Sequence, residues 1–477
     1  MSYDVAVIGA GVVGALVARE LTKLNIRVAL LEKRNDVAMG ATKANSAIVH
    51  GGFDAKPGTL KAKLNVEGTA LMPLVCNELN VPFGNNGSLV LGFDEEDMET
   101  LRSLLARAAE NNVPGVRIID REELLEMEPN IAKEAVGALV SATAGIVCPY
   151  ELTIAAVENA VENGLSFIRN CEVQGIDFAD SEFVLHTTLG DIRSQFVVNA
   201  AGAYAGDIAR MIGDESVRIQ PRLGEYYLLD RAVGLTVTHT VFQCPGKMGK
   251  GILVSPTVDG NLLIGPTALD MEEFDNVATT AEGLEKVKIL ATKSVPSVSA
   301  KNAITSFAGL RAHPLNDDFI IDYSPVNRRF IHAAGIESPG LSASPAIAKY
   351  VRSLLLGIAG DLQSRNDFDP VRRKPVRFRA LNDKQREELI AQNRAYGRIV
   401  CRCEMITEGE IVDAIHAPAG ARDVDGVKRR TRAGMGRCQG GFCGSKVVEI
   451  LARELNVPLN EITKFGGGSD ILYDKTK

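Results

Sequence analysis

The first 32 residues contain the pattern that most constrains how this chain folds. Residues 3–8 (YDVAVI) predict a short buried strand, and a glycine-rich turn at residues 9–14 follows it at once. Residues 13–24 then predict an amphipathic helix and residues 27–31 a second buried strand, which Glu32 closes. This order is typical of a parallel βαβ unit that binds a dinucleotide. The alternative is a tight turn in an α/β sheet that holds no ligand.

Each glycine of this turn has its own expected role. Gly9 permits the sharp change of direction between strand and helix, Gly11 lets the backbone approach a pyrophosphate, and Gly14 allows the helix to pack closely on the strand. The free N–H groups and the positive dipole end of the helix suit the phosphates. Glu32 is placed to accept hydrogen bonds from the adenosine ribose, and an acid there disfavours the 2′-phosphate of NADP.

Later segments decide between FAD and NAD. After the βαβ unit the chain enters a Gly/Ser/Asn-rich stretch at residues 40–52 rather than another βα unit. Residues 196–202 (FVVNAAG) predict a strand that ends in small residues, residues 330–342 a second strand and a turn, and residues 346–358 a helix. These blocks resemble the D-amino-acid oxidase superfamily of FAD-dependent oxidoreductases over residues 1 to about 365. Within it they are most similar to glycerol-3-phosphate and L-2-hydroxyglutarate dehydrogenases.

The resemblance implies which residues lie along FAD. The ADP part is implied to lie on Gly9, Gly11, Gly14 and Glu32. The pyrophosphate and ribityl chain are implied to follow Thr42, Asn45 and Ser46, and the adenosine side Ala201 and Gly202. The flavin ring is implied to lie near Gly335, Gly340, Leu341 and Ser342. N–H donors at the O2 edge of the ring stabilise the negative charge that grows there during reduction.

The expected fold class is α/β, with a Rossmann-like FAD-binding domain, an antiparallel-sheet substrate domain and a small helical C-terminal module. The FAD-binding part is discontinuous and is expected at residues 1–75, 145–215 and 305–365. The substrate domain is expected at residues 76–144 and 216–304. Its strands are predicted at residues 222–229, 253–256 and 261–264, the last two around the hairpin signal Val258-Asp259-Gly260-Asn261. Residues 366–395 are expected to be a linker with a polar helix at residues 382–395. Residues 396–477 are expected to form the C-terminal module.

Two residues are candidates for the chemistry. His50 precedes Gly51-Gly52 in a loop that the resemblance places beside the flavin, and its pKa class suits proton abstraction near neutral pH. The alternative is a histidine that only hydrogen-bonds the flavin or caps a turn. Arg311 offers a fork of donors to a phosphate or carboxylate, unless it is a surface arginine at a strand end. His313 and Lys250 are weaker candidates for assisting roles.

Four of the eight cysteines crowd into the C-terminal part, with the spacing C-x-C-x34-C-x4-C at Cys401, Cys403, Cys438 and Cys443. The second pair precedes a predicted helix at residues 444–455. The GRCQGGFC block resembles the bacterioferritin-associated-ferredoxin-like [2Fe–2S] module, which implies that the four thiolates hold a [2Fe–2S] cluster. A structural Zn(Cys)4 site is the alternative. The cationic run at residues 428–432 either offsets the charge of the cluster or is a solvated surface run.

Charge separates the two parts of the chain. Residues 371–477 carry 21 Lys/Arg and 14 Asp/Glu, whereas residues 1–370 carry 32 and 46. The basic residues of the tail lack interleaved aromatic residues, so no nucleic-acid site is expected. No segment has the composition of a signal peptide or of a membrane span, which predicts a cytoplasmic protein whose membrane contact, if any, is peripheral on the inner face.

The resemblance implies an FAD-dependent dehydrogenase that oxidises a small anionic substrate. The preferred substrate is sn-glycerol 3-phosphate, with dihydroxyacetone phosphate as the product. Electrons then leave through the [2Fe–2S] centre to an acceptor protein, to partner subunits or to a quinone. A 2-hydroxy acid such as L-2-hydroxyglutarate, or an opine, is the alternative substrate. A non-catalytic electron-transfer subunit is the alternative of another class.

Overall fold

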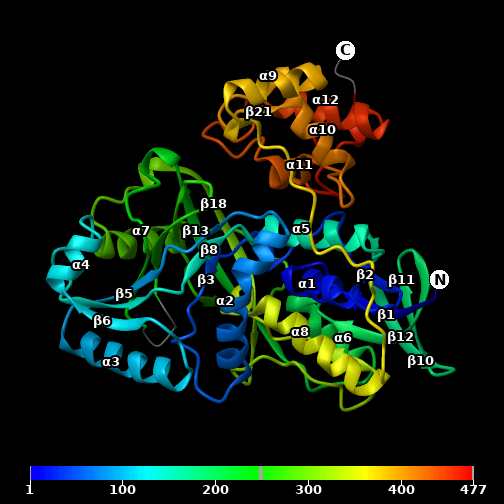
Figure 1. The fold of residues 1–477 in the computed structure, drawn as a ribbon, viewed down its shortest axis with the longest axis horizontal. Helices are drawn as coiled ribbons and strands as arrows, with labels where there is room; N and C mark the ends of the chain where they lie inside the picture. Colours follow the sequence, from blue (N-terminus) through cyan, green and yellow to red (C-terminus); the bar gives the residue numbers. More distant parts are fainter. Residues whose placement is uncertain (1, 246–250, 475–477) are drawn as a thin grey trace.

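The computed structural model of the 477-residue chain describes residues 2–245 and 251–474. Figure 1 shows a body with two large sheets, and a C-terminal unit that stands on it at the end of a long linker. The termini of the chain lie in different parts of the molecule, the N-terminus at the edge of the body and the C-terminus on the C-terminal unit (Figure 1).

A seven-stranded sheet forms the first half of the body, in the order β10-β11-β12-β1-β2-β9 with β19 paired to β12. Strands β1, β2, β9, β12 and β19 are parallel where they pair, and β10 and β11 are antiparallel additions at one edge. The strands are β1 (Ser2–Ile8), β2 (Val28–Leu31), β9 (Ser166–Ile168), β10 (Val173–Ala179), β11 (Glu182–Thr187), β12 (Gly190–Asn199) and β19 (Phe330–His332). The βαβ unit predicted from the first 32 residues is confirmed at the centre of this sheet.

Helix α1 (Val12–Leu21) is buried on every side rather than on one face. It packs against α5 (Pro149–Glu162) and α8 (Gly340–Ala359), and α8 packs in turn against α2 (Leu60–Glu78). The amphipathic helix expected over residues 13–24 is therefore shorter and fully covered, because neighbouring helices cover the side that the sequence pattern leaves to solvent. The short helix α6 (Ala205–Arg210) follows β12.

A nine-stranded, mostly antiparallel sheet forms the second half of the body, in the order β17-β13-β16-β15-β14-β5-β7-β6 with β18 paired to β13. Its strands are β5 (Ser88–Gly92), β6 (Val116–Asp120), β7 (Gly137–Ser141), β13 (Ile219–Leu229), β14 (Thr240–Gln243), β15 (Leu253–Pro256), β16 (Leu262–Gly265), β17 (Leu269–Asp270) and β18 (Ala303–Pro314). Its helices are α3 (Glu95–Glu110), α4 (Arg121–Met127) and α7 (Ala281–Ser294). The predicted hairpin is present as β15 and β16.

Strand β18 pairs with β13 along its whole length, from Ala303 opposite Leu229 to Pro314 opposite Ile219. Residues 305–314, which the sequence assigns to the FAD-binding part, thus belong to the nine-stranded sheet in the structure. The α/β fold class with a second, largely antiparallel sheet is confirmed. A three-stranded sheet of β3 (Ile48–Val49), β8 (Gly145–Val147) and β4 (Phe83–Gly84) connects the two halves.

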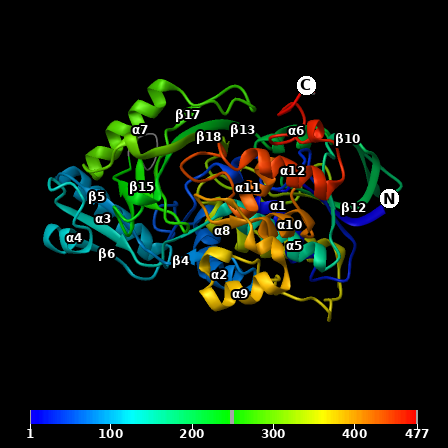
Figure 2. The same ribbon diagram turned by 90° about the horizontal axis from the view of Figure 1, so that it is seen from above.

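The C-terminal unit has its own small core, built from residues of β20, α10, α11 and α12. Its elements are α9 (Asp383–Gln392), β20 (Ile399–Cys401), β21 (Ile406–Thr407), α10 (Glu408–His416), α11 (Val424–Thr431) and α12 (Gly444–Leu455). Short 3-10 turns complete the fold at Ala41–Lys43, Gly202–Tyr204, Arg231–Val233, Ala300–Asn302, Phe378–Ala380, Arg394–Gly397 and Leu459–Glu461. Seen from above, this unit covers α1 and α5 (Figure 2). Within residues 2–245 and 251–474, no helix combines the length and apolar character needed to cross a membrane.

Ion pairs fasten the C-terminal unit to the body. The carboxylate of Asp36, just after β2, lies 2.6 Å from the guanidinium of Arg429 and 2.7 Å from that of Arg430, and all three side chains are buried. Arg432 likewise pairs with Asp259 of the body at 2.7 Å. Residues 428–432 therefore form the interface of the C-terminal unit instead of a solvated surface run. Burial by itself raises the pKa of the Asp36 carboxyl, but the two guanidinium groups lower it well below its usual range.

Replacing Asp36 by asparagine should loosen this interface. The amide keeps the shape but removes the charge that both buried guanidinium groups face, and breaking a buried ion pair from one side costs about 3–5 kcal/mol. We expect Asp36→Asn to lower the melting temperature near neutral pH and to speed proteolysis of the linker. The exposed variant Asp361→Asn is the control. Unchanged melting and digestion of Asp36→Asn would contradict the role given to this pair.

The same pair predicts a pH dependence. Since the folded-state pKa of Asp36 is lowered, its stabilisation is complete above the unfolded-state pKa of about 3.9 and is lost as the pH falls through the folded-state value. The stability difference between the wild-type protein and Asp36→Asn should therefore shrink below about pH 4.

Candidate active site

The turn between β1 and α1 is built so tightly that only glycine fits at two positions. Gly9 has a φ of +103°, and a β-carbon there would lie 2.5 Å from the carbonyl oxygen of Ala200. A β-carbon at Gly14 would lie 1.9 Å from the carbonyl oxygen of Gly9. Glu32 accepts hydrogen bonds from the backbone N–H groups of Ala10 and Arg34, both at 2.9 Å. The predicted phosphate-binding turn therefore has the compact geometry that a pyrophosphate needs.

The loop expected along the pyrophosphate and ribityl chain lies next to the start of α1. The hydroxyl of Thr42 accepts a hydrogen bond from the N–H of Val12 at 3.0 Å, and a β-carbon at Gly11 would lie 3.3 Å from the same hydroxyl. The Asn45 side chain hydrogen-bonds the backbone of its own loop. The Ser46 hydroxyl lies 3.4 Å from that of Tyr226. Thr42 thus contacts the start of α1, Ser46 faces Tyr226 and Asn45 holds its own loop, and their contacts with FAD stay a prediction.

The remaining predicted FAD contacts lie at two places, after β12 and near the start of α8. Ala201 and Gly202 follow β12 beside the glycine turn, since Ala201 also limits the space at Gly9. Gly335 has a φ of +61°, and Gly340, Leu341 and Ser342 form the first turn of α8. The buried hydroxyl of Ser342 accepts a hydrogen bond from the N–H of His50 at 2.7 Å. Segments almost 300 residues apart in the sequence therefore meet at one place.

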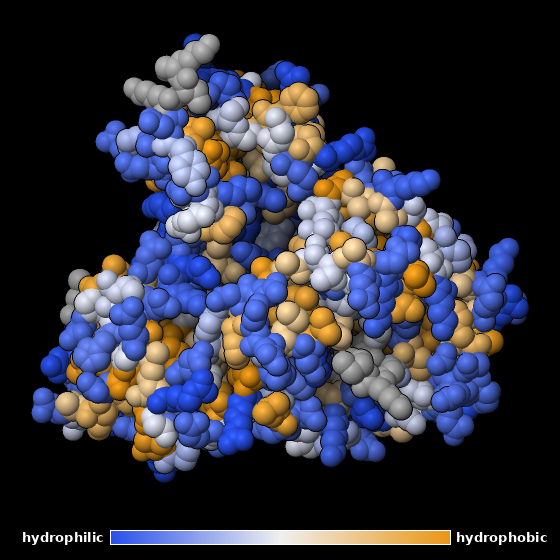
Figure 3. Space-filling model, turned by 180° about the vertical axis from the view of Figure 1, so that it is seen from behind, coloured by the Kyte–Doolittle hydropathy of each residue, from blue (hydrophilic) through white to orange (hydrophobic). Residues whose placement is uncertain are grey.

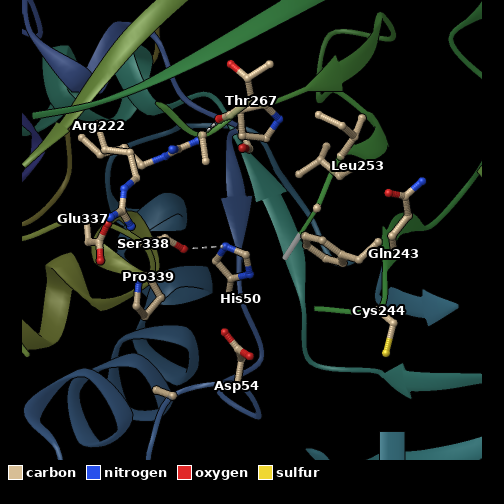
Figure 4. Close-up of a pocket in the computed structure, with 18 of the residues that line it drawn as sticks. His50, Asp54, Arg222, Gln243, Cys244, Leu253, Thr267, Glu337, Ser338 and Pro339 are labelled. Atoms are coloured by element: carbon tan, nitrogen blue, oxygen red, sulfur yellow. Dashed lines mark hydrogen bonds between the residues drawn. The ribbon is translucent and has the colours of Figure 1, made fainter. Parts of the chain in front are cut away.

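A cavity of about 660 Å³ lies beside this meeting point, within the size range of small-molecule sites. Its lining includes Ser46, His50, Lys61, Arg222, Arg311 and Glu337. Figure 4 shows the His50 ring facing Ser338, and the centroid of the ring lies 5.7 Å from that of Phe242. The Nε2 atom of His50 lies 3.3 Å from the Ser338 hydroxyl. The structure thus brings both predicted catalytic residues to the wall of one cavity.

Cationic side chains outnumber acidic ones in this wall. Lys61, Arg222, Lys286 and Arg311 line the cavity, against Asp54 and Glu337. Arg311 donates a hydrogen bond to the carbonyl oxygen of Thr267 at 3.1 Å, which holds its guanidinium at the cavity. A net positive lining suits a small substrate with an anionic tail.

The carboxylate of Glu337 is held by a lysine and a histidine. This carboxylate lies 3.0 Å from Lys61 Nζ and 2.9 Å from His313 Nδ1. Burial alone raises the pKa of Glu337, but the hydrogen bond from His313 and the charge of Lys61 lower it to about 2. His313 therefore contacts Glu337 rather than the cavity itself. Lys250, the other weak candidate, lies outside the described residues.

Sequence reasoning missed Lys61 and Arg222. Lys61 is the second residue of α2, and nothing in its sequence neighbourhood separates it from an ordinary helix lysine. Arg222 lies directly opposite Arg311 in the β13–β18 pair. Knowledge of that pairing register would have identified it, but residues 230–302 lie between the two strands in the sequence.

The four cysteines of the C-terminal unit form two pairs. The sulfur atoms of Cys403 and Cys438 are 3.7 Å apart, and Cys401 hydrogen-bonds Cys443 in the core of the unit. Two thiolates on one tetrahedral metal at about 2.3 Å are separated by about 3.7 Å, so each pair fits one metal atom. Backbone N–H groups of Gly440 and Phe442 point at the Cys438 sulfur, as thiolates of a cluster require.

The four thiols lie close enough to interact with one another. A [2Fe–2S] cluster has two iron atoms with two thiolates each, and four neighbouring thiols can supply these ligands.

Comparison with known proteins gives the same division of the chain. A family described as FAD dependent oxidoreductase matches residues 4–354, and a BFD-like [2Fe-2S] binding domain matches residues 399–453. A glycerol 3-phosphate dehydrogenase of Caloramator mitchellensis is 51% identical over 475 residues, covering 100% of this chain and 99% of that protein. Human mitochondrial L-2-hydroxyglutarate dehydrogenase is 28% identical over 73% of this chain and 87% of its own length.

A solved structure resembles the body closely. Dithionite-reduced L-alpha-glycerophosphate oxidase from Mycoplasma pneumoniae with FAD bound superimposes with a TM-score of 0.76 and 29% identity. The match covers 79% of this chain and 100% of that one. The predicted FAD and [2Fe–2S] cofactors are confirmed by these matches together.

Substitution of Gly14 tests the turn that holds FAD. A methyl group there overlaps the backbone oxygen of Gly9, so α1 must move away from β1; such overpacking costs about 1–3 kcal/mol. We expect Gly14→Ala to be purified with less bound flavin, measured by its visible absorbance, and to melt at a lower temperature. Gly467→Ala is the matched control, since no atom lies within 4 Å of a β-carbon there. Full flavin content in Gly14→Ala would contradict this account.

Proposed function

We propose that this chain, which belongs to the FAD-dependent oxidoreductase family, oxidises sn-glycerol 3-phosphate to dihydroxyacetone phosphate and passes the electrons through its [2Fe–2S] centre to an acceptor. One observation carries the proposal. The relative named glycerol 3-phosphate dehydrogenase covers the whole chain, including both the FAD-binding part and the cysteine unit, at 51% identity. The chain is accordingly an enzyme rather than an electron-transfer subunit alone.

The cavity supports an anionic substrate. Arg311 and Arg222 lie opposite each other on neighbouring strands, and both line the cavity. The guanidinium of Arg222 is paired with Asp270 at 2.6 Å, which leaves the fork of Arg311 as the better match for the oxygens of a phosphate monoester. Lys61 lies at the same cavity, where its charge is partly offset by Glu337. We assign Arg311 to the phosphate, with Arg222 beside it.

His50 is the proposed base. When bound, FAD accepts the hydride of the carbon–hydrogen bond, and the protein must take the proton of the hydroxyl. The ring of His50 lies in the cavity wall, its main chain is held by Ser342 and its Nε2 atom faces the Ser338 hydroxyl. These contacts fix the orientation of the ring, which favours proton transfer by holding it in one geometry.

Strand β13 extends from the substrate cavity to the C-terminal unit. Arg222, near its start, lines the substrate cavity, and Asp230, directly after its end, pairs with Arg437 beside Cys438 at 2.8 Å. One strand thus connects the cavity to the cysteine loops. A [2Fe–2S] centre takes one electron at a time, so it would pass the two electrons of each substrate singly to the acceptor.

An anaerobic titration tests the substrate. The protein, with measured flavin and iron contents, is mixed with glycerol 3-phosphate, with glycerol and with L-2-hydroxyglutarate. We expect the flavin band to bleach with glycerol 3-phosphate alone, followed by the electron paramagnetic resonance signal of the reduced cluster. Bleaching with L-2-hydroxyglutarate alone would replace the proposed substrate by the hydroxy acid. Bleaching with none of them, in fully loaded protein, would contradict the proposed reaction.

Substitution of His50 tests its role. Because general base catalysis contributes about 10²- to 10⁴-fold, we expect His50→Ala to slow flavin reduction by a factor in this range. The visible flavin spectrum should stay close to that of the wild-type protein. The matched control is His186→Ala, an exposed histidine of β11 that pairs with Asp177 and Asp191. A decrease of less than about tenfold would assign His50 to a structural role.

A further inference from the structure

We propose that the face around Cys403 and Cys438 docks an acidic, one-electron carrier protein. This inference rests on the proposed exit of electrons through the cluster and adds the class of partner and the place where it binds. The docking face consists of two loops, residues 402–405 and 437–446, which meet where the sulfur atoms of Cys403 and Cys438 lie 3.7 Å apart.

The cysteines are buried unequally. Cys401 and Cys443 belong to the core of the C-terminal unit, whereas Cys403 is exposed and Cys438 is partly exposed. A cluster held by these four residues has one edge toward the core and the other toward solvent. Electron transfer between proteins needs close approach of the two redox centres, so the partner must cover the edge at Cys403 and Cys438.

Apolar side chains lie exposed beside this edge. Phe442, between Cys438 and Cys443, is 85% exposed, and Met405 is 42% exposed. Exposed aromatic residues and methionine are enriched where proteins bind one another. Both side chains come from the docking face, so a partner centred on the cluster edge covers them together.

Cations outnumber acids at the docking face. Arg402, Arg437 and Lys446 are exposed; Arg437 pairs with the partly buried Asp230 of the body at 2.8 Å, and Lys446 pairs with the exposed Glu449 of α12 at 2.7 Å. Glu404 is the acidic residue of these two loops, and its side chain is 3% exposed. Arg231, Arg379 and Arg432 surround its carboxylate. The docking face therefore presents positive charge around an apolar centre, although the chain as a whole has a net charge of −7.

This charge pattern selects an acidic partner. Complementary charges speed the encounter of two proteins by about 10- to 10³-fold, and the effect falls with ionic strength. Transient redox complexes bury small interfaces, which fits an apolar centre of two side chains with a charged rim. An anionic lipid surface carries the same sign of charge, but it would not require a protruding aromatic residue beside the cluster edge, so we favour a protein.

The test uses two haem proteins of opposite charge as probes. The full-length protein is reduced with dithionite and freed of excess reductant, so the result does not depend on the substrate. It is then mixed with ferric cytochrome b5, which is acidic, or with ferric cytochrome c, which is basic. Each haem takes one electron, and the oxidised cluster is refilled from the two-electron-reduced flavin. We expect faster transfer to cytochrome b5 at low ionic strength and a decrease with added salt, and the opposite salt response for cytochrome c.

Charge-reversal variants locate the effect. We expect Arg402→Glu combined with Lys446→Glu to slow transfer to cytochrome b5 by about tenfold or more and to speed transfer to cytochrome c. Phe442→Ala should slow both. Lys349→Glu, an exposed lysine on α8, is the control with the same change of charge. The iron content and the rate of reduction of a small neutral quinone should be unchanged in every variant. If the double variant loses the cluster, Arg402→Gln combined with Lys446→Gln replaces it.

Three results would overturn the proposal. The first is equal rates and equal salt responses for the two haem proteins. The second is an effect of Lys349→Glu as large as that of the double variant. The third is that vesicles with anionic headgroups bind the wild-type protein and block electron transfer but do not bind the double variant, while transfer to cytochrome b5 shows no salt dependence. This result would assign the docking face to a membrane surface. A failure of glycerol 3-phosphate to bleach the flavin would leave all of these measurements intact.

Discussion

The carbonyl oxygen of Gly9 fills the space that a side chain at Gly14 would need, and the body is arranged around that contact. It lets α1 lie close to β1 and β12, so the start of the helix, with its free N–H groups, comes to the carboxyl ends of the central strands. Glu32 and Thr42 hydrogen-bond this turn from two other segments.

The two sheets have separate tasks at the cavity. Segments beside the seven-stranded sheet supply His50 and the first turn of α8. The hydroxyl of Ser342 in that turn accepts a hydrogen bond from the N–H of His50. The nine-stranded sheet supplies Arg222 and Arg311 from adjacent strands. The proposed proton acceptor and the proposed anion-binding groups thus come from different parts of the body and line one cavity. The three-stranded sheet of β3, β8 and β4 includes the strand that directly precedes His50.

Charge has two functions in the C-terminal unit. Arginines on its buried side form ion pairs with Asp36 and Asp259 of the body. The opposite net charges of the two parts of the chain thus meet at this interface. Cations that remain exposed lie at the cluster edge (Arg402 and Lys446 among them). Seen from behind, a hollow opens between part of the unit and the body (Figure 3). Beside it the unit is held by ion pairs, and Ala419 packs into the hydrophobic core of the body.

The sequence by itself determined the features that depend on near neighbours in the chain. The βαβ unit, the β15–β16 hairpin and the helix at residues 444–455 follow from local glycine spacing, turn residues and periodicity. The cysteine block resembles a [2Fe–2S] module, and the family match over residues 399–453 confirms that module. Only the tertiary structure decided which distant residues meet. Arg222 faces Arg311 through strand register, Glu337 is balanced by Lys61 and His313, and residues 428–432 bind the body instead of solvent. A charged side chain looks the same in sequence whether water or a buried partner compensates its charge, and that choice is made when the segments pack.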